Sequence, residues 1–176
     1  NGSANLEIGA ERAVDGARTI EDNLNALTNV TNVQAGAAEG DLLLRTTADD
    51  ATVTLGSGDD ALLHGANAGS ANGQIDLGAG NNAAYVIGDN NTVDAGVGDD
   101  TVEVGGGLAM NPTTNTTLNL GDGDNTIMTE ATGSKPVTGL DVTTGSGDDQ
   151  LALSTDTSNV TANLGAGQNT VDAASD

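Results

Sequence analysis

The residues of this chain best suited to chemistry are carboxylates that follow pairs of closely spaced glycines. Four segments have this pattern, in which two glycines separated by one residue stand next to aspartates. Glycine tolerates a positive φ, so such a segment can turn tightly and point carbonyl and carboxylate oxygens into one concavity. The candidate metal-binding residues of these four turns are Gly56, Gly58, Asp59, Asp60, Gly96, Gly98, Asp99, Asp100, Gly121, Asp122, Gly123, Asp124, Gly145, Gly147, Asp148 and Asp149.

Crowded carboxylates such as Asp59 and Asp60 would repel one another strongly if nothing compensated their charge. A hard cation that accepts about six to eight oxygen ligands at roughly 2.3–2.6 Å would compensate it, and calcium fits this description best. Stacking of equivalent turns about 4.8 Å apart would bring carboxylates of neighbouring turns together. The turns therefore predict Ca²⁺ as a cofactor.

The turns recur along the chain, and their recurrence predicts the architecture. They open at Gly56, Gly78, Gly96, Gly121, Gly145 and Gly165. The differences between these successive sequence numbers are 22, 18, 25, 24 and 20. Short alternating segments flank each turn, as 92–95 and 101–104 flank the turn that opens at Gly96. A recurrence of about 20 residues with turn residues between short strands is typical of a solenoid, in which coils bury their apolar side chains by stacking.

Period-two alternation identifies the side chains that point inward. In the coil that contains Gly96 these are Val93, Ala95 and Val102. The equivalent positions of the other coils are Val53, Leu55, Leu62, Ile75, Leu77, Ala84, Leu118, Leu120, Ile127, Val142, Thr144, Leu151, Ala162, Leu164 and Val171. We therefore predict an all-β fold, a parallel β-solenoid of about seven coils, each about 18–25 residues long.

At its acidic turns the chain resembles the RTX (repeats-in-toxin) family, whose repeat GGxGxDxUx has a large apolar residue at U. The segments 56–62, 96–102 and 145–151 match GxGxDxU, and the resemblance covers roughly residues 50–176. It implies a right-handed parallel β-roll with calcium between its turns. It also implies export by type I secretion, as for toxins, proteases, adhesins and surface-layer proteins.

The chain departs from the family pattern in two ways. The first glycine of the family repeat is replaced, for example by Leu55 and Ala95, and the last turn residue alternates between aspartate and asparagine. The alternating residues are Asp60, Asn82, Asp100, Asn125, Asp149 and Asn169. A column of asparagines can satisfy itself through amide hydrogen bonds without metal. Calcium at the aspartate-bearing turns and a metal-free acidic solenoid therefore both remain open.

Two parts of the chain are expected to differ in regularity. Residues 1–30 do not carry the repeat and form an N-terminal capping or lead-in segment, or dock onto a preceding coil of a longer protein. Residues 31–176 form the solenoid, and its degenerate first coil places Gly36 opposite Gly56. The segments between coils vary in length, so one edge is regular and acidic and the other bears loops.

Composition narrows the possible partners and location. The 176 residues carry a net charge of −22 with four Lys and Arg, no cysteine and one aromatic residue, Tyr85. Such an acidic surface excludes nucleic acid as a natural partner, and no run is apolar enough for membrane insertion. The chain begins at Asn1, so we interpret it as a mature product or a fragment. We expect an extracellular or cell-surface location. N-x-Thr sequons begin at Asn29, Asn90, Asn115 and Asn159.

Candidate catalytic groups are sparse. His64 is the only histidine, and without cysteine a nucleophile–histidine arrangement would depend on it alone. Asp76 and Asp94 stack on one face and could in principle act on a polysaccharide, but the sequence places no basic or aromatic group beside them. We expect no enzymatic activity, with His64 structural or solvated.

Three functions remain. The first is a structural or adhesive module of a secreted surface protein (surface layer, adhesin or filament), whose partners are like subunits, adjacent repeats or cell-surface polysaccharide. The second is an accessory β-roll of a secreted enzyme, such as a protease or a polysaccharide-modifying enzyme. The third is a metal-free acidic solenoid from a salt-loving organism, in which charge maintains solubility.

Overall fold

A computed structural model describes residues 6–8, 30–65, 70–106 and 111–174 of the chain. All regular elements in these ranges are β-strands, arranged in two parallel sheets. Sheet A contains β1 (Leu6–Ile8), β3 (Leu42–Thr46), β5 (Ala61–His64), β7 (Ala83–Val86), β9 (Thr101–Gly105), β11 (Thr126–Glu130), β13 (Gln150–Leu153) and β15 (Thr170–Ala173). Sheet B contains β2 (Asn32–Gln34), β4 (Thr52–Thr54), β6 (Gln74–Asp76), β8 (Thr92–Asp94), β10 (Thr113–Asn119), β12 (Val137–Thr143) and β14 (Thr157–Asn163).

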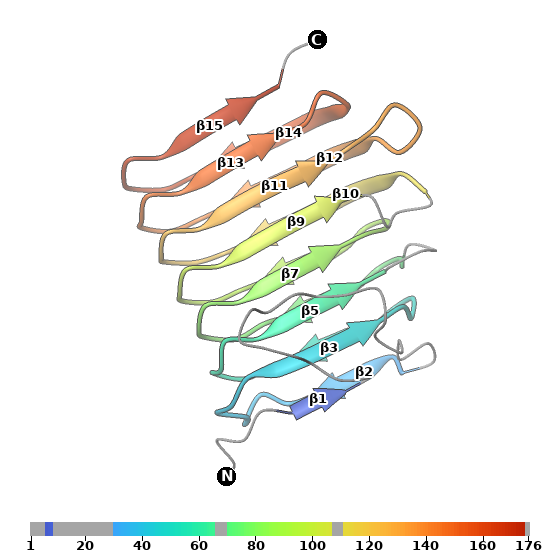
Figure 1. Cartoon of the computed structure of the whole chain (residues 1–176), viewed down its shortest axis with the longest axis vertical. Coiled ribbons are helices and arrows are strands. Elements are labelled where there is room, and N and C mark those ends of the chain that lie inside the picture. The colour runs from blue at the N-terminus through green and yellow to red at the C-terminus, as the bar shows by residue number, and fades with distance from the viewer. Residues whose placement is uncertain (1–5, 9–29, 66–69, 107–110, 175–176) are drawn as a thin grey trace.

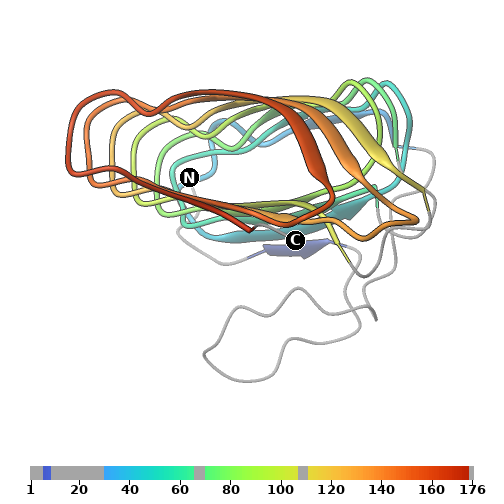
Figure 2. The same cartoon turned by 90° about the horizontal axis from the view of Figure 1, so that it is seen from above.

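The two sheets are the long sides of a flattened solenoid, which Figure 2 shows along its axis. Each coil passes through one strand of sheet B, a tight turn, one strand of sheet A and a loop. In Figure 1 the chain runs from left to right along the front sheet, returns along the back sheet and climbs toward the C-terminus, which makes the solenoid right-handed. Seven strand pairs, β2–β3 to β14–β15, complete about six turns. The predicted all-β solenoid is confirmed.

The strand register follows the glycine intervals of the sequence. In sheet B, Val53 lies opposite Ile75, and Ile75 lies opposite Val93, so these steps equal the first two glycine intervals. In sheet A, Val102 lies opposite Ile127, a step that equals the third interval. Because equivalent residues stack on one another, each position of the repeat forms a column along the solenoid axis.

The inward columns form the core. Val93, Ala95 and Val102 are completely buried, and the equivalent aliphatic residues of coils two to six lie in the same cluster. The space between the sheets is filled mainly by Leu, Val, Ile and Ala. The predicted inward positions are confirmed. In the last coil Val171 is 57% exposed because the described residues contain no coil beyond it.

The first coil differs from the predicted alignment. Gly36 does not stack on Gly56: instead, Ser57 donates its backbone N–H to the carbonyl of Ala38. The step from β3 to β5 in sheet A is two positions shorter than the step from β2 to β4 in sheet B. The first turn is therefore two residues longer than the second. Our alignment on Gly36 was wrong because it followed the nearest glycine rather than the register of both strands.

Part of the predicted N-terminal segment is visible. The backbone of β1 pairs in parallel with β3, with Leu6 opposite Leu42, so sheet A has one strand more than sheet B at this end. The rest of the predicted lead-in, residues 1–5 and 9–29, lies outside the described residues.

The edge opposite the acidic turns contains an asparagine column that the sequence analysis missed. Its members are Asp50, Asn72, Asn90, Asn115, Gly139 and Asn159. All have positive φ, between 52° and 75°. Side-chain amides link successive members: Asn72 donates to Asp50 at 2.9 Å, Asn90 to Asn72 at 3.3 Å and Asn115 to Asn90 at 3.1 Å. Asparagine tolerates this backbone conformation better than most residues. Three of the four N-x-Thr sequons, at Asn90, Asn115 and Asn159, therefore begin at positions where the fold itself favours asparagine.

Gly139 interrupts this column, and replacing it by asparagine is expected to stabilise the protein by about 1 kcal/mol. The backbone already has the left-handed conformation that its neighbours adopt as asparagine, and the substitution reduces the entropy of the unfolded chain. The new Cβ would lie 2.8 Å from Oδ1 of Asn115, the movable end of that side chain. Gly139→Ala is the control, because it adds the Cβ without the amide and should destabilise. Thermal melting measures both, and equal effects of the two substitutions would contradict the role of the amide.

Candidate functional site: the acidic turn edge

The last residue of each acidic turn points into the solenoid and forms the inner column. Asp60, Asn82, Asp100, Asn125 and Asp149 are all at most 2% exposed. Each accepts, through Oδ1, a hydrogen bond from the backbone N–H at the equivalent position of the preceding coil. The donors and distances are Leu42 to Asp60 at 2.8 Å, Asp60 to Asn82 at 2.9 Å, Asn82 to Asp100 at 2.8 Å, Asp100 to Asn125 at 3.1 Å, Asn125 to Asp149 at 3.0 Å and Asp149 to Asn169 at 2.9 Å.

The preceding residue of each turn points outward and forms the outer column. Its side chain accepts from the backbone N–H of the following coil, so the outer column runs in the opposite direction to the inner one. The donors and distances are Asp59 to Asp41 at 2.9 Å, Asn81 to Asp59 at 2.9 Å, Asp99 to Asn81 at 2.8 Å, Asp124 to Asp99 at 2.8 Å, Asp148 to Asp124 at 2.8 Å and Gln168 to Asp148 at 2.7 Å. Each coil is thus bound to both neighbours at this edge.

The alternation of aspartate and asparagine separates the buried charges of the inner column. Asn82 and Asn125 stand between the aspartates and donate their amides to the carbonyls of Gly80 and Gly123 in their own turns, both at 3.0 Å. An amide can donate to a backbone carbonyl where a carboxylate cannot, so asparagine satisfies a group that aspartate leaves unpaired. Buried aspartates are therefore two coils apart and do not face each other directly.

Asp100 is the least satisfied member of the inner column. Its Oδ2 atom is buried and has no hydrogen-bond partner among the described residues. In contrast, Oδ2 of Asp149 accepts the hydroxyl of Thr144 at 2.7 Å, and the residue at the Thr144 position of the Asp100 coil is Ala95. Burial raises the pKa of Asp100 to about 6, although hydrogen bonds from Asn82 oppose this and the charge of Asp99 adds to it. The charged form of the Asp100 carboxylate therefore destabilises the fold.

The glycines of the turns allow coils to stack closely. A Cβ at Gly98, whose φ is 138°, would collide with the backbone carbonyl of Gly80 in the coil below. Gly98 in turn donates its N–H to the carbonyl of Asp122 in the coil above at 2.9 Å. Glycine is therefore required at this position because the backbones of neighbouring turns are in direct contact. At the turn surface, Ser146 donates its backbone N–H and hydroxyl to Asp122, which lowers the pKa of that carboxyl.

The predicted calcium-binding aspartates other than Asp122, which accepts hydrogen bonds from Ser146 at the turn surface, fall into two groups that point in opposite directions. Asp60, Asp100 and Asp149 lie inside, and Asp59, Asp99, Asp124 and Asp148 lie in the outer column. Among the residues that the structure describes, no three His, Cys, Asp or Glu side chains gather where they could hold a metal ion. Because Oδ1 of each of these aspartates accepts a hydrogen bond from a backbone N–H, the arrangement fits a hydrogen-bonded ladder.

His64 is the last residue of β5 and points into the core beside the loop edge. It is completely buried, neither ring nitrogen has a hydrogen bond of good geometry within the described part of the chain, and its ring occupies the space that a side chain at Gly73 would need. Burial lowers the pKa of His64 to about 4, and the nearby Asn91 side chain and the charge of Asp49 oppose this shift. His64 is therefore a neutral structural residue and not a solvated one.

Acidification should remove stability through His64. Its pKa is lowered from 6.5 to about 4, so the contribution to stability is fully present above pH 6.5 and is lost as the pH falls toward 4. The full difference corresponds to about 3 kcal/mol. Asp100 acts in the opposite sense, since a raised carboxyl pKa stabilises the fold as the pH falls below 6.

Melting of His64→Leu from pH 4 to pH 7 isolates the histidine effect. Leucine suits the site because the same column contains Val86 and Val104. We expect the variant to lose less stability on acidification than the wild type. In the His64→Leu background, Asp100→Asn should then remove the opposing gain. An unchanged pH dependence in His64→Leu would show that His64 does not titrate on unfolding.

The other groups considered for catalysis lie on open surfaces. Asp76 and Asp94 are neighbours on the outer face of sheet B, and they accept hydrogen bonds from the N–H of Gly78 at 3.0 Å and the amide of Asn119 at 2.7 Å. On the outer face of sheet A, Tyr85 donates to Glu130 at 3.2 Å. Burial raises the pKa of Glu103, which lies close to Tyr85 and Glu130.

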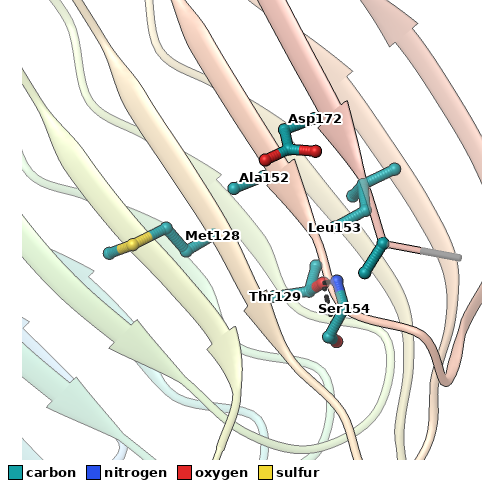
Figure 3. A pocket seen from close by; sticks show the side chains of 7 residues that line it. Met128, Thr129, Ala152, Leu153, Ser154 and Asp172 are labelled. Carbon is teal, nitrogen blue, oxygen red and sulfur yellow. Dashed lines mark hydrogen bonds between the residues drawn. The ribbon is translucent and has the colours of Figure 1, made fainter.

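A hollow of about 270 Å³ lies at the loop-side end of β11, β13 and β15. Figure 3 shows Met128, Ala152 and Leu153 around it, with Asp172 at its border. The hydroxyls of Thr129 and Ser154 are 3.2 Å apart, and Ser154 also accepts the N–H of Ala131 at 2.8 Å. These hydroxyls close the loop that follows β13, so the hollow presents mainly apolar side chains.

No family model matches the chain, and neither a curated protein nor a solved structure is found to be similar to it. The resemblance to RTX repeats therefore rests on the turn motifs alone. No helix in the described part of the chain is long and apolar enough to cross a membrane.

Proposed function

We propose that this chain is a non-enzymatic structural or adhesive module of a secreted cell-surface protein, such as a surface-layer protein, an adhesin or a filament. The observation that supports this proposal most is that the acidic turns connect neighbouring coils to one another. Their side chains bind the backbone of neighbouring coils, as in the bond from Asn125 to Asp149, and leave little chemistry for a substrate. The result is a rod built from one repeated contact. Its partners would be like subunits, adjacent repeats or cell-surface polysaccharide.

The proposed location is supported by composition. A net charge of −22 gives a soluble, self-repelling surface, and a chain without cysteine needs no particular redox compartment to fold. Such a module suits an extracellular medium that contains salt, where screening reduces repulsion between its carboxylates. Type I secretion enters the proposal only through the resemblance of the turns to RTX repeats.

Calcium binding is a second candidate property, and one observation favours it. Oδ2 of Asp100 is a buried carboxylate oxygen with no partner among the described residues, and the exposed Asp99 precedes it in the same turn. A cation there would relieve the unfavourable burial of the charge. An accessory role in a secreted enzyme and a metal-free acidic solenoid remain the alternatives to a surface module.

Cell fractionation and an adhesion assay test the proposed function. The protein should be found at the cell surface, and cells that carry Val102→Asp should adhere less because the buried core is broken. Val97→Thr is the matched control, since Val97 lies on an outer turn and is 57% exposed. An intracellular location, or equal adhesion with both variants, would contradict the proposal. Loss of activity of an attached catalytic domain would favour the accessory role.

A further inference from the structure

The asparagine column contains one chemically labile pair, Asn72–Gly73. Among the described residues this is the only place where asparagine precedes glycine. In such a pair the backbone nitrogen of the glycine can attack Cγ of the asparagine, because glycine has no Cβ to hinder the approach. The residues that follow the other asparagines of the column, Asn91, Thr116 and Val160, all have larger side chains. Asn72 is therefore the member of the column most open to this reaction.

The fold requires both residues of the labile pair. Asn72 has a φ of 60° and continues the left-handed column, where asparagine is tolerated better than most residues. A Cβ at Gly73 would lie 2.6 Å from Nε2 of His64 and 2.7 Å from Oδ1 of Asn91, and both of these side chains are completely buried. Two separate structural requirements therefore place asparagine directly before glycine.

The folded coil restrains both of the groups that would react. The N–H of Gly73 donates to Oδ1 of Asn91 at 2.8 Å in a buried hydrogen bond. The side-chain amide of Asn72 donates to Asp50 at 2.9 Å, and its Oδ1 accepts the amide of Asn90 at 3.3 Å. The glycine nitrogen thus keeps its proton while Cγ of Asn72 is held in the column. Reaction requires this coil to open locally.

Asn91 is fixed in the orientation that protects Gly73. Its Nδ2 donates to the backbone carbonyl of Ser70 at 3.0 Å, while its Oδ1 accepts the N–H of Gly73. An amide with its oxygen and nitrogen exchanged would satisfy neither neighbour, since nitrogen cannot accept and oxygen cannot donate. The contacts of Asn91 therefore hold an acceptor against the nitrogen that would act as the nucleophile.

We propose that Asn72 is a site of spontaneous deamidation, and that Asn91 suppresses the reaction in the folded protein by holding the N–H of Gly73. When the coil opens, the nitrogen of Gly73 loses its proton and forms a bond to Cγ of Asn72. The Cγ–Nδ2 bond breaks, and the amide leaves with that proton as ammonia. Water then cleaves either C–N bond of the succinimide, which leaves an aspartate or an isoaspartyl linkage at position 72.

Either product weakens the loop edge. The amide of Asn72 now donates to Asp50, so a carboxylate in its place would face another carboxylate across the same gap. Like charges so close together repel. The isoaspartyl linkage also lengthens the main chain, which displaces Gly73 from Asn91. The converted coil therefore opens more easily than the original one, and the converted fraction rises with the time that the coil has spent open.

The test is incubation of the full chain at mildly alkaline pH, folded and in urea, with peptide mass mapping of Asn72 and labelling of the isoaspartyl product by an isoaspartyl methyltransferase. Deamidation should be at least about tenfold slower in the folded wild type than in urea. Folded Asn91→Leu should react roughly tenfold faster than the wild type, because the N–H of Gly73 loses its acceptor. Asn91→Asp should react at about the wild-type rate. Both variants lose the bond to Ser70, but aspartate keeps the acceptor oxygen.

Val142→Ala separates local opening from global unfolding, because it weakens the core in β12. At matched losses of melting temperature, equal acceleration by Val142→Ala and Asn91→Leu would overturn the role of Asn91. An intact Asn72 in urea, or equal rates in the folded and unfolded chain, would overturn the proposed site. If Asn91→Leu does not fold, wild-type amide exchange in low urea decides. Deamidation should follow exchange at Gly73, and deamidation that follows the slower exchange of Val102 would overturn the inference.

Discussion

Val102→Asp is expected to unfold the solenoid or to lower its unfolding free energy by at least about 4 kcal/mol. Val102 is completely buried between Ala84 and Ile127 in the core column of sheet A. A carboxylate there would have no counterion, because the inward columns around it are aliphatic. Thermal and urea melting, followed by circular dichroism, measure the loss.

Glu103→Lys is the matched control one residue along the same strand. Glu103 points to the outer face, and burial beside Tyr85 and Glu130 raises its pKa. A lysine would replace a carboxyl that lies near another carboxyl, so we expect a small change or a gain in stability. Comparable losses for Val102→Asp and Glu103→Lys would show that the alternation of β9 is assigned to the wrong faces.

Asp100→Asn should stabilise the metal-free protein by about 1 kcal/mol or more at neutral pH. The amide removes a buried charge and can donate to the carbonyl of Gly98, as Asn82 does to Gly80. Asp149→Asn is the matched control. Its carboxylate already accepts the hydroxyl of Thr144 at 2.7 Å, so the same substitution should gain less there.

If calcium binds at this turn, removing the Asp100 carboxylate should lower the stability of the calcium-loaded protein instead of raising it. Variants at this turn therefore also test metal binding. Binding to the folded state alone would stabilise the wild type by about 2.7 kcal/mol at a hundredfold excess over Kd. Asp99→Asn with Asp100→Asn should remove much of that gain. The measurement is a melting curve in EDTA and in millimolar calcium at constant ionic strength, so that screening alone cannot imitate binding. Coincident curves, or equal effects of magnesium and sodium, would contradict specific calcium sites and leave the ladder as the explanation.

Replacing Asn81 and Asn82 by alanine distinguishes the two explanations from the other side. These amides add no charge, so the change in calcium affinity should be small. The ladder predicts a clear loss of stability, because Asp60 and Asp99 would each leave a backbone N–H without its acceptor. Unchanged melting of this double variant would show that the columns contribute little.

Most of the fold could be predicted because the repeat fixes it locally. The glycine intervals matched the register of both sheets, and alternation around residues such as Val93 and Val102 identified the core. The first coil was misaligned since its register depends on two strands with different steps, which no single glycine reports. The asparagine column was missed because Asn72 and Asn90 resemble ordinary loop residues until their common φ is known.

The acidic site was predicted in position but not in orientation. The turn residues were treated as one cluster, although Asp60 lies two residues before the inward Leu62 and Asp59 lies three residues before it. Extending the period-two alternation back into the turn would have assigned them to opposite sides. What no pattern could supply is the direction of the hydrogen bonds, since this depends on how far one coil is shifted over the next.

The aspartate–asparagine alternation also bears on how such a chain can lengthen. Deleting a single coil, for instance the one with Asn82, would place Asp60 directly beneath Asp100 in the buried column. Two unscreened carboxylates would then meet where an amide now separates them. Removing an asparagine coil together with its aspartate neighbour keeps the order intact. Duplications and deletions should therefore be tolerated in units of two coils. Related chains should then differ in their number of coils by even numbers.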